Sequence, residues 1–314
     1  MRNKMILYDA QGKFMNDSWY AFDGTEYHAF FLERQPGDPE TRHIDHSVSR
    51  DLRSWKYCGT VLSPGREHWL DTQLATGSIC KKGELWYLLF TAECSAPPYS
   101  GFAVASSPDL YHWTLHDSMV LGGKEPIPFQ LANRRLPCVL LADPYIYPEE
   151  MDGWFYADFN AQAVDLPYNH RAVQAMMRTR DFLHWEPYKI AALDCCDRIE
   201  TAQVWKHGDK WYMYGGAVTS GLTADQELIE DYHFSRFENF LYCADAFDGP
   251  FLRTQRLEFP DYPDYPGKNL YIAKVLRDTD GEDVMLVNDI GPNGVVGPYA
   301  VTYGADGITL TAKS

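Results

Sequence analysis

A short motif that recurs along the chain is the feature that most restricts its fold. It ends in Asp-Leu or Asp-Phe, two further residues and Trp, and its clear copies are Ser47–Trp55, Ala105–Trp113 and Met177–Trp185. A second pattern, a turn with Gly, Asp or Thr followed by an aromatic segment, alternates with the first. Its five copies begin 56 to 73 residues apart, at Thr25, Gly83, Asp152, Gly208 and Gly281. Repeats of this length are typical of solenoids and propellers.

The composition of the repeats favours β-strands. Segments rich in Tyr, Phe, Trp, Val and Thr lie between turn residues, and each repeat has room for four short strands. A sheet of that size cannot bury its apolar faces alone, whereas packing between two similar sheets around an axis buries them. We therefore predict an all-β fold, a five-bladed β-propeller with a single domain spanning residues 1–314.

The repeated Asp and Trp residues have a structural explanation. An Asp side chain in a tight turn accepts hydrogen bonds from the backbone of its own turn. A Trp at a fixed position in each repeat fills the space between neighbouring blades. We expect these residues to hold the fold together rather than to carry chemistry.

The charge of the chain excludes some partners. Lys and Arg number 28 against 44 Asp and Glu, which gives a formal net charge of −16. A charge of this sign repels phosphate backbones and anionic membranes, so we expect neither nucleic-acid nor membrane binding. The chain has no apolar run long enough to span a membrane and no recognisable leader, so we expect a cytoplasmic protein.

The cysteines indicate a reducing compartment. There are seven, at irregular spacings and without a CxxC pair, so we expect neither a disulfide framework nor structural zinc. The sequence also has no recognisable phosphate- or nucleotide-binding loop. We predict no cofactor and no metal, and the oligomeric state is open.

Three carboxylates precede the aromatic segments of different repeats. Asp17, Asp143 and Glu200 lie 10, 12 and 11 residues before an aromatic residue of the first, third and fourth copy. These offsets place all three at the same end of the innermost strands, where propellers form their sites. Each alone has a structural explanation, as a turn residue, a cap or an exposed charge. Three at one level repel one another and lower stability unless a reaction uses them.

Such a set of carboxylates suits the cleavage of a glycosidic bond. One carboxylate attacks or activates water, a protonated one donates to the leaving oxygen, and a third binds hydroxyls or tunes the others. The predicted partner is therefore an oligosaccharide or a small glycoside.

The order of the motifs resembles glycoside hydrolase family 32, the β-fructosidases of clan J, which have a five-bladed catalytic propeller. The residues that carry the resemblance are Met15-Asn16-Asp17, His46–Trp55, Leu62–Gly65, Thr76–Ser78, Ala142-Asp143-Pro144 and Glu200. It implies Asp17 as nucleophile, Asp143 as transition-state stabiliser and Glu200 as general acid/base, with retention of configuration.

The chain departs from the family around these acids. Ala142 replaces a sugar-binding Arg, and Ser18 and Thr201 follow the acids where the family has Pro and Cys. The tail from Asp289 onward is long enough only to finish the last blade, so we expect no C-terminal β-sandwich. The three acids are kept, while most of the residues that bind fructose in the family are replaced.

Further residues are candidates for substrate binding. Trp19 and Trp69 lie beside the first and second inner strands, outside the repeated Trp positions, and aromatic faces stack on sugars. The other candidates are Asn16, Asp45, His46 and Thr76, of which Thr76 falls on a substrate-binding Ser of the family. Core packing is the alternative for the two Trp residues and for His46.

Two alternatives to a retaining fructosidase stay open. An inverting arabinosidase or xylosidase of family 43 also uses two Asp and one Glu. The separation of the Asp17 and Glu200 carboxyl groups distinguishes the two, since about 5 to 5.5 Å suits a nucleophile and about 6.5 to 9.5 Å leaves room for water. The second alternative is a propeller that binds a glycan without cleaving it.

Overall fold

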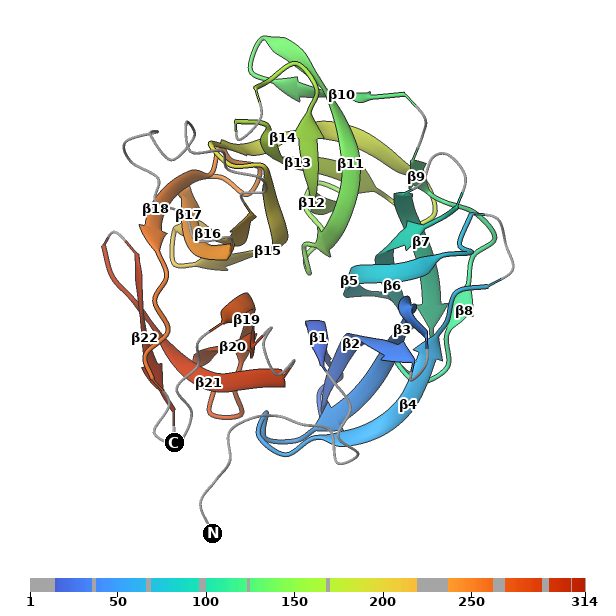
Figure 1. Ribbon diagram of the computed structural model, residues 1–314. Helices are drawn as coiled ribbons and strands as arrows, with labels where there is room; N and C mark the ends of the chain where they lie inside the picture. Colours follow the sequence, from blue (N-terminus) through green and yellow to red (C-terminus); the bar gives the residue numbers. More distant parts are fainter. Residues whose placement is uncertain are drawn as a thin grey trace.

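Five β-sheets surround a central axis in the computed structural model of the chain (Figure 1). The structure describes residues 15–35, 38–65, 69–95, 100–122, 125–167, 170–218, 237–261, 269–289, 294–305 and 307–313. Every regular element within these ranges is a strand, and none of them contains a helix that could cross a membrane. The five-bladed β-propeller predicted from the repeats is confirmed.

The first two blades come from the first 122 residues, and each is contiguous in sequence. Blade 1 consists of β1 (Asn16–Phe22), β2 (Tyr27–Gln35), β3 (Asp38–Ser49) and β4 (Lys56–Leu62). Blade 2 consists of β5 (Gln73–Lys82), β6 (Leu85–Glu93), β7 (Ser100–Ser107), β8 (Thr114–Leu115) and β9 (Leu121–Gly122). Their innermost strands are β1 and β5.

The other three blades follow in order around the ring. Blade 3 consists of β10 (Ile127–Leu131), β11 (Arg134–Ile146), β12 (Phe155–Ala163), β13 (Ala172–Thr179) and β14 (Trp185–Asp194). Blade 4 consists of β15 (Arg198–His207), β16 (Lys210–Val218), β17 (Phe237–Ala244) and β18 (Leu252–Arg256). Blade 5 consists of β19 (Leu270–Arg277), β20 (Asp283–Asp289), β21 (Gly294–Tyr303) and β22 (Ile308–Ala312). The strand β10 precedes the inner strand β11 and also bridges to β14 at Gln130 and Lys189.

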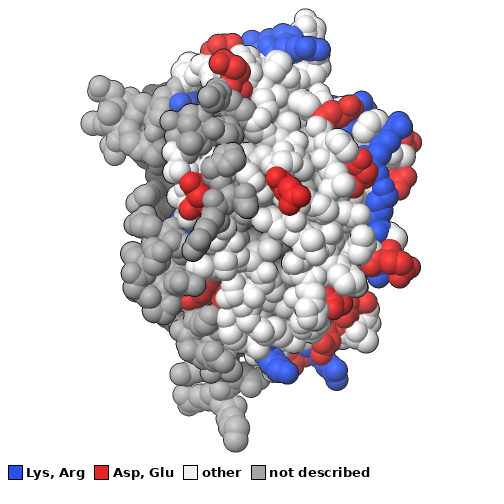
Figure 2. Space-filling model, turned by 90° about the vertical axis from the view of Figure 1, so that its right-hand side faces the viewer, with Lys and Arg blue, Asp and Glu red and all other residues white. Residues whose placement is uncertain are grey.

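The hydrophobic core is divided among the five blade interfaces. Buried apolar clusters fill the junctions between neighbouring blades. The cluster that contains Met15, Phe31 and Leu286 joins blade 5 to blade 1. On the side of the molecule that Figure 2 shows, charged side chains of both signs gather along the right-hand edge, and few lie on the described surface at the centre of the view. The apolar surface that stabilises the protein therefore lies between the sheets.

The repeated Asp residues form the turns that the sequence predicts. Asp109 Oδ1 accepts hydrogen bonds from the backbone N–H groups of Tyr111 and His112, at 2.9 and 2.8 Å. Asp51 and Asp181 make the same pair of bonds to the residues two and three positions later. The Trp residues of all three motifs pack in the blade-interface clusters, so this structural prediction is confirmed.

A β-bulge interrupts the innermost strand of every blade at an equivalent place. The bulges lie between Asn16 and Trp19, Leu74 and Gly77, Ala142 and Tyr145, Glu200 and Gln203, and Tyr271 and Ala273. Four of them contain a residue other than glycine in the left-handed region, namely Asp17, Asp143, Thr201 and Ile272, with φ of 48° to 66°. Such residues are uncommon and strained, and a bulge re-aims the side chains beside it.

Side chains close the ring between the last and first blades. Asn288, on β20, is buried and donates from Nδ2 to the Met15 carbonyl at 3.0 Å. Its Oδ1 accepts from the Ser18 hydroxyl at 2.8 Å and from the Ser18 N–H at 3.4 Å. Tyr27 adds a hydrogen bond from its hydroxyl to the Arg277 carbonyl at 2.8 Å. Among the described residues, no strand of blade 5 pairs with a strand of blade 1.

Replacement of Asn288 tests this closure. The substitution Asn288→Ala leaves the Met15 carbonyl and Ser18 without a buried partner, so we expect the free energy of unfolding to fall by about 3 kcal/mol. Urea denaturation measures the change. The exposed Asn133 in the turn between β10 and β11 gives the matched control, Asn133→Ala, with an expected change below about 0.5 kcal/mol. Equal effects of the two substitutions would contradict this role of Asn288.

Candidate active site

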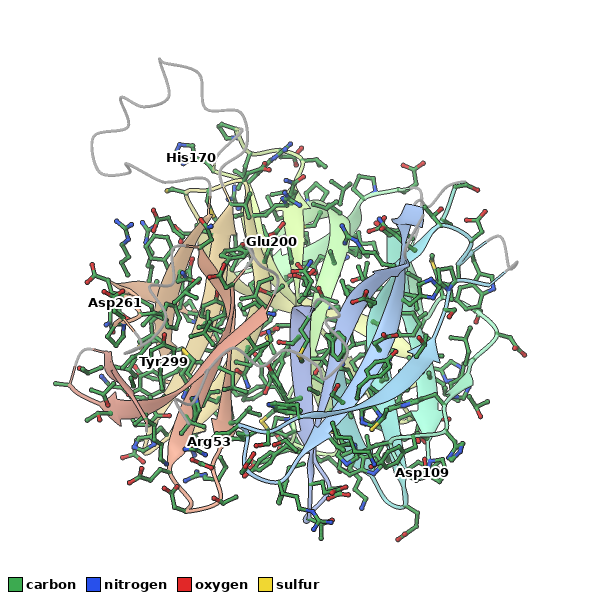
Figure 3. All side chains as sticks on the ribbon, turned by 60° about the horizontal axis from the view of Figure 1, so that its bottom comes forward. Arg53, Asp109, His170, Glu200, Asp261 and Tyr299 are labelled. Carbon is green, nitrogen blue, oxygen red and sulfur yellow. The ribbon has the colours of Figure 1, made fainter. Side chains whose placement is uncertain are left out.

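Three carboxylates from blades 1, 3 and 4 lie at the bulges of their innermost strands. Asp17 is in the bulge of β1, Asp143 in that of β11, and Glu200 begins that of β15. Figure 3 shows Glu200 near the centre of the ring, toward the end opposite Arg53 and Asp109. Because the bulges occupy equivalent places on the inner strands of their blades, we infer that all three acids lie toward the same end of the axis.

The charges of the three acids act on one another. Burial raises the pKa of Asp17 to about 6, and the negative charge of Asp143 acts in the same direction. Burial likewise raises the pKa of Glu200 to about 7, with contributions from Asp143 and then Asp17. Carboxyl groups interact this strongly only when they are close together in a poorly solvated space. The structure therefore brings the three predicted acids into one cluster.

Asp143 links blades 2 and 4. Its backbone N–H donates to the Thr91 hydroxyl of blade 2 at 3.0 Å. Its carboxylate Oδ2 accepts a hydrogen bond from the N–H of Thr201, in the bulge of β15, at 3.2 Å. The acid is consequently held at both its backbone and its side chain, which fixes its position beside Glu200.

Two side chains that the sequence analysis did not identify bind Glu200. Arg198 Nη1 lies 2.8 Å from Glu200 Oε1, and the Tyr271 hydroxyl donates to Oε2 at 3.1 Å. Both contacts favour the ionised carboxylate and lower its pKa, against the larger effect of burial. Arg198 precedes Glu200 by two positions on the same strand, so the alternation of side chains could have revealed it. Tyr271 comes from blade 5, which has no acid in the cluster.

Asp17 has three favourable neighbours. The Thr76 hydroxyl, on the bulge of the blade 2 inner strand, donates a hydrogen bond to its carboxylate. The cations Arg42 and Lys274 lower the pKa of Asp17, again against burial. Thr76, predicted from sequence as a substrate-binding residue, thus contacts the cluster directly.

The structure places Trp19 and His46 in the wall between blades 1 and 2 rather than at the cluster. Trp19 is 2% exposed and stacks on Phe30, and fully buried His46 stacks on the same Phe30. The pairing of Trp19 with Phe30 and of Phe30 with His46 puts the three side chains in one row across the sheet. Burial lowers the pKa of His46 to about 3, which is typical of a packed, neutral histidine. These positions agree with the core-packing alternative for both residues, and their contact with a substrate stays a prediction.

The remaining candidates have mixed positions. Asn16 is half-buried and directly precedes Asp17 on β1. Asp45, on β3, is fully buried and accepts a hydrogen bond from the Tyr57 hydroxyl at 2.8 Å within its own blade. Trp69 is half-buried against the cluster of the blade 1–2 interface. Their contact with a substrate stays a prediction. In the parts of the chain that the structure describes, no group of three or more His, Cys, Asp or Glu is arranged to hold a metal.

No protein-family model matches this sequence, and no curated protein does. Solved structures do share its fold. The Bombyx mori GH32 β-fructofuranosidase BmSUC1 superposes with a TM-score of 0.69 at 15% identity, covering 96% of this chain and 63% of that one. Bacillus subtilis levansucrase gives 0.72 at 14% identity, covering 100% and 89%. A thermostable family-43 glycoside hydrolase gives 0.67 at 14% identity, covering 96% and 94%.

These likenesses confirm the predicted fold, a propeller of the kind found in families 32 and 43. The chain spans less than two thirds of the length of the Bombyx mori enzyme. At these identities the comparison concerns architecture, so the chemistry must be argued from the residues of this chain.

The raised pKa of Asp17 predicts a pH-dependent effect of its removal. The folded protein disfavours the ionised form, so stability is complete below about pH 4 and falls as the pH rises through about 6. We expect Asp17→Asn to gain about 3 kcal/mol relative to the native protein between pH 4 and pH 8. Urea unfolding at the two pH values measures this gain.

The exposed Asp117 provides the control. Asp117→Asn is expected to change the free energy of unfolding by less than about 0.5 kcal/mol at both pH values. If Asp17→Asn showed the same difference from the native protein at pH 4 and pH 8, the carboxyl group would not be ionising in a buried environment.

Proposed function

We propose that this protein is a glycoside hydrolase whose carboxylate cluster cleaves a glycosidic bond. The observation that carries the proposal is the placement of three carboxylates at equivalent bulges of three inner strands, where the charge of Asp143 acts on both Asp17 and Glu200. Burial raises the pKa of Asp17 to about 6 and that of Glu200 to about 7. Both groups therefore exchange protons near neutral pH, as a nucleophile and a proton donor working together require.

The preferred reaction is a double displacement. An Asp17 carboxylate oxygen forms a bond to the anomeric carbon while the bond to the leaving oxygen breaks and Glu200 protonates that oxygen. Glu200, now ionised, takes a proton from water as the water oxygen bonds to the anomeric carbon, and Asp17 leaves. Asp143 stabilises the positive charge that develops on the sugar in both steps. An acceptor hydroxyl in place of water would give transfer by the same residues.

A fructoside or a related oligosaccharide is the proposed substrate class. Its support is the fold shared with a β-fructofuranosidase and a levansucrase, together with the acid motifs kept at Asp17, Asp143 and Glu200. A mutant of the Bombyx mori protein is described in complex with sucrose, with 14% identity to this chain. Ala142, where family 32 has a sugar-binding Arg, argues for a different set of contacts to the sugar.

Inversion by a family 43-like mechanism is the second candidate. The observation in its favour is that the family-43 structure and this chain cover one another almost completely. In that mechanism Asp17 would activate a water molecule instead of attacking the sugar. Glycan binding without cleavage is less favoured, because binding alone does not require three mutually repelling, half-buried acids.

A cytoplasmic location is part of the proposal. All seven cysteines are free, and Cys58 is exposed on the outer strand of blade 1. Free thiols persist most readily where the compartment is reducing.

Substitution of the two principal acids tests the enzymatic proposal. On a panel of fructosides, arabinosides and xylosides, we expect Asp17→Asn and Glu200→Gln each to lower kcat/KM by about 10³-fold. Asp117→Asn is the matched control and should retain native activity. Sugar release measured by chromatography gives the rates. A native protein that released no sugar from any member of the panel would contradict the proposal.

The configuration of the first product distinguishes the two mechanisms. The double displacement predicts that the released sugar initially has the anomeric configuration of the substrate, and proton NMR within the first minutes of reaction detects it. The opposite anomer would assign Asp17 to the activation of water. The Asp117→Asn protein should give the same anomer as the native one.

A further inference from the structure

Lys274 is a buried cation at the base of the carboxylate cluster, and the proposed reaction does not use it. It lies on β19, the inner strand of blade 5, and is 5% exposed. Among the residues whose side-chain burial the structure describes, which leave out 34–41, it is the only Lys or Arg that is buried. A charged side chain is rarely buried without a specific compensation, so the surroundings of Lys274 call for an explanation.

The ammonium of Lys274 binds the backbone next to Glu200. Nζ donates to the Thr201 carbonyl at 2.5 Å and lies 3.3 Å from the Ala202 carbonyl. Thr201 has a φ of 50° and belongs to the bulge that begins at Glu200. Its N–H donates to Asp143 Oδ2 at 3.2 Å. The strained residue beside Glu200 is therefore held by an acid from blade 3 and a base from blade 5.

Three carboxyl groups face the charge of Lys274. Asp17 comes from β1, Asp143 from β11 and Asp158 from β12. Burial raises the pKa of Asp158 to about 7, so this group is largely protonated at the pH at which Asp17 ionises. Burial lowers the pKa of Lys274 to about 8, which still leaves the ammonium charged there. At that pH the positive charge of Lys274 favours the ionisation of Asp17.

We propose that Lys274 is a positioning residue, whose ammonium fixes the bulge that carries Glu200 and favours the ionised form of Asp17. Lys274 also lines a cavity of about 340 Å³, together with Trp19, Tyr145 and Gln203. Its side chain therefore borders this cavity and also binds the bulge that carries Glu200. Arg42 is the other cation that acts on Asp17. The catalytic consequence rests on the proposed function, whereas the ionisation of Asp17 can be measured in the resting protein.

The first experiment compares Lys274→Met with the native protein by carboxyl ¹³C NMR between pH 3 and pH 9. Loss of an opposite charge that acts on Asp17 should raise the titration midpoint of Asp17 by about one pH unit. Asp17→Asn identifies the resonance. The matched control is Lys210→Met, which removes an exposed ammonium that donates to the Ala305 carbonyl at 3.0 Å and should leave the midpoint unchanged. An unchanged midpoint in folded Lys274→Met protein would overturn the proposal.

A measurement on the native protein covers the case in which Lys274→Met does not fold. In protein labelled at the lysine Cε carbons, the Lys274 resonance is identified by its loss in Lys274→Arg. It should show the charged form at pH 6 and titrate near pH 8. A neutral Lys274 at pH 6 would refute the assigned role, whatever the fate of the methionine variant.

Kinetics then separate this inference from the proposed function. In Lys274→Met, the acidic limb of the pH profile of kcat/KM should move to higher pH by the same interval as the Asp17 midpoint. In Lys274→Arg, the limb should return most of the way to its native position. An Asp17 midpoint that shifts in a protein without glycosidase activity would leave the role of Lys274 in place and remove the proposed reaction. A Lys274→Met protein that is active and has the native pH profile would support the proposed reaction and contradict the role of Lys274.

Discussion

The cost of holding the Asp17 and Glu200 carboxyl groups in a poorly solvated place beside the charge of Asp143 is the constraint on which the rest of the site depends. Burial raises the pKa values of Asp17 and Glu200, and the negative charge of Asp143 raises both further. The surrounding groups offset this cost only in part: Thr76 and Arg42 act on Asp17, Tyr271 and Arg198 on Glu200. A cluster compensated only in part is what acid–base chemistry near neutral pH requires, because full compensation would return every group to its ordinary pKa.

Contacts from one blade to the inner strand of the next run around the ring. Thr76 of blade 2 binds Asp17, Thr91 of blade 2 accepts from the Asp143 N–H, and Asp143 accepts from the Thr201 N–H. In blade 4, Gln203 forms two hydrogen bonds with the backbone of Val275, and Asn288 of blade 5 then bonds to blade 1. The inner strands do not pair with one another, so these side chains set their relative heights and thereby the geometry of the cluster.

The repeats and the offsets of the acids could be predicted from sequence because packing between blades imposes a period, and because an acid in an apolar context is conspicuous. The orientation of Trp19 could not, since the bulge after Asn16 inserts a residue and reverses which side of the strand the next side chains face. Tyr271 and Lys274 were missed for another reason. They lie in blade 5, whose inner strand brings no carboxylate, and nothing local in the sequence reveals a contact formed across the ring.

Each blade is contiguous in sequence among the described strands, and within those ranges side chains, with no shared strand, join blade 5 to blade 1. Opening the ring between two other blades would therefore cut none of the described strands. We expect the propeller to tolerate circular permutation at such a junction, since the order of the blades along the chain would change while each described sheet stayed whole.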